Sequence, residues 1–76
     1  MQLIKIAVAK ELFNAGGFDG ARIGPAPMEE GYILVFTKDE EGRILSNDRG
    51  SARIFKTVDT ARKIAKEIGF RAITLY

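Results

Sequence analysis

The lysines and arginines of the second half of the chain have the types and spacing that best suit a binding function. Residues 43–76 hold eight Lys or Arg against three Asp or Glu, whereas residues 1–42 hold four against seven. Such an excess of positive charge attracts anions, most commonly nucleic acid. The predicted nucleic-acid-binding residues are Arg49, Arg53, Lys56, Arg62, Lys63, Lys66 and Arg71. The alternative is a set of solubilising charges, with Asp59 and Lys63 as an ordinary i,i+4 pair.

Other residue types offer little chemistry. The chain has no His and no Cys, so it lacks the commonest general base and the usual soft metal ligands. The acidic run 39–41 lacks the spacing of a calcium loop and is typical of a solvated hairpin tip. Ser46 and Ser51 have no histidine to activate them. We therefore expect no enzymatic activity, no metal site and no cofactor.

Size and composition indicate one domain, residues 1–76. With 46% hydrophobic and 29% charged residues, the composition is that of a soluble globular protein. No apolar run approaches the roughly 20 residues of a membrane-spanning helix. Lys5, Lys10 and Glu11 interrupt the apolar N-terminus, which argues against a signal peptide. We expect a cytoplasmic protein without a membrane partner.

The N-terminal region reads as a helix over residues 2–15, because its apolar residues recur at helical spacing. The stripe consists of Ile4, Val8, Leu12 and Ala15. The glycines at 16 and 17 follow this helix and end it, so they are not interpreted as a phosphate loop, which would precede a helix. Alternation of apolar residues leaves open a strand over 3–8 followed by a helix over 9–15.

The middle of the chain predicts strands. Pro25 and Pro27 restrict residues 21–24 to a short edge strand at most. Residues 32–36 are β-branched or aromatic at four of five positions and predict a central strand. A polar hairpin loop over 38–42 then leads to a partner strand over 43–46. After a loop over 47–51, residues 52–56 predict the third strand of a meander.

A second helix over residues 58–68 has the clearest end signals. Thr57 is the expected N-cap, Gly69 the C-terminal glycine, and Phe70 is expected to fold back on the last turn. The predicted buried face consists of Val58, Ala61, Ile64, Ala65 and Ile68. Residues 71–76 alternate and predict a final strand, whose free edge would favour a homodimer.

These elements predict an α+β fold: a single small domain with an antiparallel meander sheet and two helices packed on one face. The expected order is a helix, a short optional strand, three meander strands, a helix and a strand. One sheet with helices on one face is favoured because each helix has a single apolar stripe.

The segments GYILVF, residues 31–36, and RIFKTVDTARKIAKEIGF, residues 53–70, carry a resemblance. They are similar to small proteins of plasmids and integrating elements described as partition- or replication-associated. The resemblance covers residues 20–75 and implies a non-enzymatic accessory factor for mobile DNA that contacts nucleic acid or a nucleoprotein complex. The alternative function is a protein-interaction module, an adaptor or an inhibitor of a host nucleoprotein machine, acting through a sheet edge or the apolar surface around Tyr32 and Tyr76.

Overall fold

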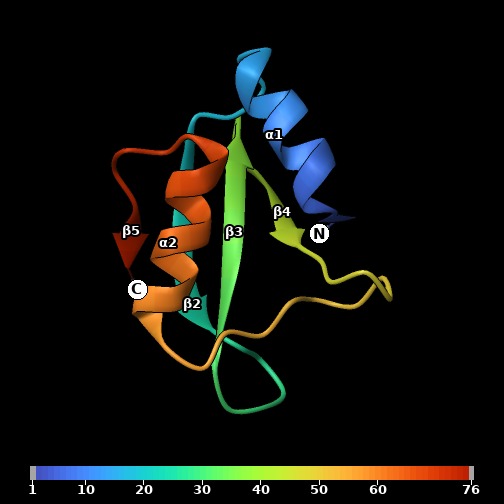
Figure 1. Ribbon diagram of the computed structural model, residues 1–76, viewed down its shortest axis with the longest axis vertical. Coiled ribbons are helices and arrows are strands. Elements are labelled where there is room, and N and C mark those ends of the chain that lie inside the picture. The colour runs from blue at the N-terminus through green and yellow to red at the C-terminus, as the bar shows by residue number, and fades with distance from the viewer. Residues whose placement is uncertain (1, 76) are drawn as a thin grey trace.

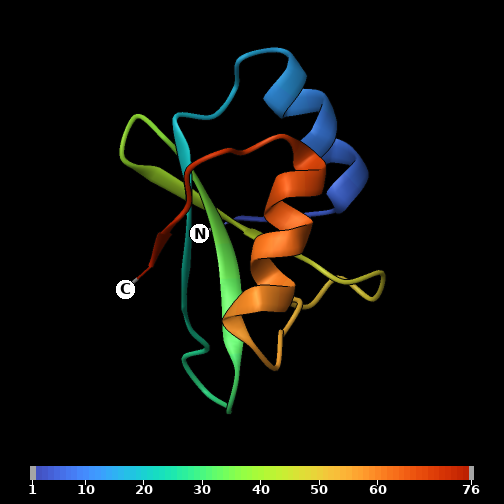
Figure 2. The same cartoon turned by 60° about the vertical axis from the view of Figure 1, so that its left-hand side comes forward.

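The computed structural model describes residues 2–75 and shows a five-stranded sheet with both helices on one face (Figures 1 and 2). The strand order across the sheet is β1-β4-β3-β2-β5. The elements are β1 (Gln2–Ile4), α1 (Ile6–Asn14), β2 (Gly20–Pro25), β3 (Tyr32–Lys38), β4 (Glu41–Leu45), α2 (Val58–Ile68) and β5 (Thr74–Leu75). Within residues 2–75, neither helix has the length and apolar character needed to cross a membrane.

The predicted α+β class with helices on one face is confirmed, but the antiparallel meander is wrong because the sheet is mixed. β3 pairs antiparallel with β2 and β4, whereas β1 is parallel to β4 and β5 is parallel to β2. Each helix returns the chain along the sheet, so the strand after it runs in the direction of the strand before it. The central position predicted for residues 32–36 is confirmed, since β3 is the middle strand.

The predicted third meander strand over residues 52–56 is wrong. This segment forms only two isolated bridges, Ser46 with Ala52 and Tyr32 with Phe55. The register of β4 with β3 ends at Val35, and Phe55 takes the vacated place beside Tyr32, exchanging two backbone hydrogen bonds of 2.8 Å with it. On that side of β3, β4 pairs with residues 35–38, and the segment over 52–56 adds only the single bridge at Tyr32.

The prediction of an N-terminal helix over residues 2–15 is also wrong for its first residues. Residues 2–4 form β1, and α1 begins at Ile6, so the strand-then-helix alternative had the right order with different bounds. The predicted buried stripe is misplaced as well: Ala9 is fully buried, whereas Val8 is 44% exposed. The pairing of β1 with β4 sets the direction in which the chain enters α1. That direction decides which side of the helix faces the core.

Strand β2 is longer than predicted and is not an edge strand. It spans Gly20–Pro25 and lies between β3 and β5. Pro25 is tolerated because β5 pairs only with Arg22 and Ile23, so the strand has a free edge at Pro25 where no amide donor is required. The final strand is shorter than the predicted 71–76: β5 contains only Thr74 and Leu75, and Tyr76 lies outside the described residues.

The predicted loop over 38–42 is a two-residue turn at Asp39 and Glu40, and β4 starts at Glu41 rather than 43. Both turn residues have positive φ, 50° and 70°, as a type I′ hairpin turn requires. Asn and Gly usually fill such turns, so Asp39 and Glu40 are an unusual pair for this position. Asp19, which is far away in the chain, stabilises this turn, because its Oδ2 accepts a 2.8 Å hydrogen bond from the Asp39 backbone N–H.

Helix α2 agrees with its predicted bounds and caps. Thr57 Oγ1 accepts a hydrogen bond from the Thr60 backbone N–H at 3.2 Å, and Gly69 ends the helix with φ of 135°. Phe70 folds back as predicted, is 6% exposed and donates its backbone N–H to Ala65 O at 3.1 Å. On the predicted buried face, Ala61, Ala65 and Ile68 are buried, whereas Val58 and Ile64 are half-buried.

Aromatic rings join the helices to the sheet. The Phe36 ring stacks on Phe18 at 5.0 Å and on Phe70 at 5.7 Å between centroids, while Phe13 of α1 meets Phe70 edge-on at 4.8 Å. α1 therefore packs on the end of α2 and on this cluster more than on the sheet. The buried core consists of Ala9, Ala21, Ile23, Leu34, Phe36, Leu45, Phe55, Ala61, Ala65, Ile68 and Phe70.

Candidate nucleic-acid interface

Helix α2 presents three basic side chains away from the core. The apolar face of the helix packs on β2 and β3, so residues on the other side face solvent. Lys63 and Lys66 are exposed and Arg62 is half-buried; we call these three the α2 basic surface. Asp59 and Glu67 are exposed on the same helix, which lowers its net charge to +1.

The segment before α2 carries three more of the predicted residues. Arg49 is exposed in a loop in which Asn47 Oδ1 accepts backbone hydrogen bonds from Arg49 at 2.9 Å and Ser51 at 3.1 Å. The Arg53 guanidinium lies over the Phe55 ring, 5.0 Å from its centroid, and is half-buried. Lys56 is exposed directly before the helix cap. Of these, Lys56 is the one that extends the α2 basic surface at the start of the helix.

The predicted nucleic-acid-binding residues do not all lie on one surface. The loop over residues 47–51 and the segment over 70–73 lie on opposite sides of the molecule in both views (Figures 1 and 2). Arg49 and Arg71 are both exposed, but on these separate segments they flank α2 at a distance rather than widening one patch. The basic residues that the structure gathers are therefore those of α2 and Lys56.

The sheet aromatics are not available to stack on bases. Phe36 is 0% exposed and Phe55 is 2% exposed, so both belong to the core. Tyr32 is half-buried and pairs through its backbone with Phe55. Contact with nucleic acid through the basic residues would consequently rest on phosphates rather than on base edges.

The acidic residues at the β3–β4 turn are organised around Asp19. Lys38 Nζ lies 3.4 Å from Asp19 Oδ1, and the hydrogen bond from the Asp39 backbone, with a smaller effect of Lys38, lowers the pKa of the Asp19 carboxyl. The Asp19 carboxylate therefore stabilises the turn. Within residues 2–75 no group of three or more acidic side chains is arranged to hold a metal ion.

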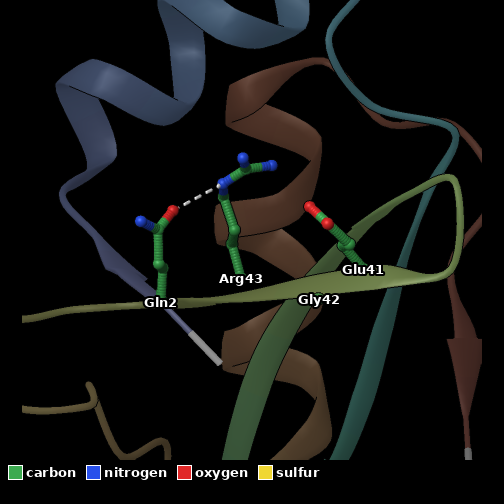
Figure 3. A pocket seen from close by; sticks show the side chains of 4 residues that line it. All are labelled: Gln2, Glu41, Gly42 and Arg43. Carbon is green, nitrogen blue, oxygen red and sulfur yellow. Dashed lines mark hydrogen bonds between the residues drawn. The ribbon is translucent and has the colours of Figure 1, made fainter.

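A depression on the helix side of β4 was not foreseen from the sequence. It has a volume of about 660 Å³ and is lined by Gln2, Glu41, Gly42 and Arg43; we call it the β4 depression. Figure 3 shows the side chains of Gln2, Glu41 and Arg43, which extend from β1 and β4 toward the side where the helices lie. Gln2 and Arg43 meet only because β1 pairs with β4, and no local pattern signals that pairing.

This arrangement defines a class: a small two-layer α+β domain whose second helix displays lysines and whose first helix leaves part of β4 open. The chain belongs to the ParC-like family, whose model matches residues 4–75. That membership agrees with the resemblance to partition- and replication-associated plasmid proteins noted in the sequence. No curated protein and no solved structure matches the chain significantly.

Proposed function

We propose that this protein is a small, non-enzymatic accessory module of mobile DNA that contacts DNA, or a protein complex bound to DNA, through the α2 basic surface and Lys56. The family name ParC-like points to a DNA-associated context. The observation that carries the proposal is the exposure of Lys63 and Lys66 on a rigid, capped helix, with no ion pair to either side chain within residues 2–75.

Phosphate contact by these lysines makes a quantitative prediction for salt dependence. Each phosphate neutralised on duplex DNA contributes about −0.9 to the slope of log K against log salt concentration. Lys63→Glu with Lys66→Glu should therefore weaken binding across unrelated sequences and flatten the slope by about 1.8 if each lysine contacts one phosphate. Fluorescence anisotropy with a labelled duplex at several salt concentrations measures both quantities.

The matched control is Lys5→Glu with Lys10→Glu, which changes the net charge equally at exposed positions just before and within α1. If this control weakens binding as much as the α2 variant does, the contact is unspecific attraction to the whole molecule. If the parent protein binds no nucleic acid at low salt, the DNA contact is wrong. Thermal melts check that both variants remain folded, as expected for exposed charges.

A protein-interaction module, the second candidate, is favoured by exposed apolar side chains. Leu3 on β1 and Leu75 on β5 are 44% and 49% exposed, and these two strands form the edges of the sheet. Free strand edges support pairing with another chain, including a homodimer through β5. A monomer mass in light scattering at high protein concentration would exclude the homodimer.

A further inference from the structure

The β4 depression holds two opposite charges that do not neutralise each other. Glu41 and Arg43 lie two residues apart on β4 and so project to the same face. Within residues 2–75 neither forms an ion pair. Arg43 Nε donates a 3.2 Å hydrogen bond to Gln2 Oε1, which orients the guanidinium and leaves its terminal N–H groups directed into the depression beside the Glu41 carboxylate (Figure 3).

These charges determine what a ligand must offer. The terminal groups of Arg43 are donors, and a carboxylate such as Glu41 is an acceptor only. A bare phosphate or carboxylate would satisfy Arg43 but would meet repulsion from Glu41. A neutral ligand with two hydrogen-bond acceptors on one edge and two donors on the next edge would bind both side chains at once, the acceptors facing Arg43 and the donors facing Glu41.

Guanine has that pattern. Its O6 and N7 atoms accept a bidentate contact from arginine, and its N1–H and N2–H groups can donate to a carboxylate. Adenine and uracil offer no such adjacent acceptor pair, and cytosine, whose N3 and O2 are acceptors, has only one donor group beside them. We propose that the β4 depression is a binding site for a guanine base, with Arg43 on O6 and N7 and Glu41 on N1–H and N2–H.

The floor of the depression is formed by backbone. Because side chains alternate along β4, the side-chain position of Gly42 points to the opposite face, and only its peptide groups line the depression between Glu41 and Arg43. The volume of about 660 Å³ falls within the roughly 300–1,000 Å³ of small-molecule sites. The proposal does not depend on DNA contact by α2, because a free guanine nucleotide would satisfy it.

NMR titration of the whole chain tests the site. Guanosine and guanosine 5′-monophosphate should each shift the backbone resonances of Gln2, Gly42 and Arg43 and the Arg43 Nε–H signal. Adenosine 5′-monophosphate, cytidine 5′-monophosphate and inorganic phosphate should leave them in place. Equal shifts with every phosphate compound and none with guanosine would show an anion site and overturn the proposal, as would no shift with either guanine compound.

Two variants separate the contacts. Glu41→Gln and Arg43→Gln should each weaken guanosine 5′-monophosphate binding by about 5- to 150-fold, the discrimination that one bidentate base contact provides. Glu29→Gln and Lys10→Gln make the same charge changes at exposed positions outside the depression and should leave binding unchanged. Affinity that survives in Glu41→Gln would refute the assignment of N1–H and N2–H to this carboxylate.

Discussion

Glycine 69 offers the sharpest test of the packing, because Gly16 at the end of the other helix provides a matched control. Both glycines have positive φ, 77° at Gly16 and 135° at Gly69. A methyl group added at Gly16 would meet nothing within 4 Å, whereas one at Gly69 would lie 2.7 Å from Cδ1 and 2.8 Å from Cζ of the Phe13 ring. Gly16→Ala therefore measures the backbone cost, and Gly69→Ala adds a steric cost.

The expected loss of stability in each variant depends on the backbone strain and on the side chains that must move. A non-glycine residue at such φ values costs about 1–3 kcal/mol. The Phe13 ring can yield at residue 69 only by leaving its edge-on contact with Phe70, and an aromatic pair contributes about 0.5–1.5 kcal/mol beyond its burial. Gly69→Ala should thus destabilise by about 1.5–4.5 kcal/mol, and Gly16→Ala by about 1–3 kcal/mol.

Urea unfolding followed by far-UV circular dichroism measures both losses. The design includes the Phe13→Ala background, in which Gly69→Ala should lose its additional cost because the clashing ring is gone. If Gly69→Ala costs no more than Gly16→Ala in the parent, or if its cost is unchanged in the Phe13→Ala background, the packing of α1 on the end of α2 is not as described.

Three further predictions concern single side chains. The pKa of Asp19 is lowered in the folded state, so its carboxylate stabilises the protein above the ordinary carboxyl pKa of 3.8 and this stabilisation is lost as the pH falls through the folded pKa. The stability difference between the parent and Asp19→Asn in urea melts should shrink toward acid pH, and a constant difference would argue against the charge of Asp19 as the cause. Thr57→Ala removes the oxygen that accepts the Thr60 amide and should cost about 0.5–2 kcal/mol, while Thr57→Ser should recover most of that loss; equal losses would show that the cap does not matter. Ile64→Ala should cost about 2 kcal/mol, the low end for aliphatic truncation, because the residue is half-buried; a loss below about half a kcal/mol, typical of surface substitutions, would place it outside the core.

The sequence by itself determined the elements whose signals are local. Helix α2 could be bounded to the residue because its cap, its apolar period and its terminal glycine all lie within a few residues of one another. The apolar run of β3 likewise indicated burial on both faces and a central place in the sheet, although the strand extends two residues beyond the predicted end at residue 36. The orientation of Lys63 and Lys66 follows from that helical period, so this part of the candidate interface was predictable.

Tertiary structure decided the features that depend on which segments meet. Residues 2–4 have both helical and strand periodicity, and only pairing with β4 selects the strand. That pairing also creates the β4 depression by bringing Gln2 to Arg43. Asp19 stabilises a turn twenty residues later, and the path of the chain separates Arg49 from Arg71. Contacts of this kind gain their free energy from partners far away in the chain, so they cannot be predicted from a local pattern of residues.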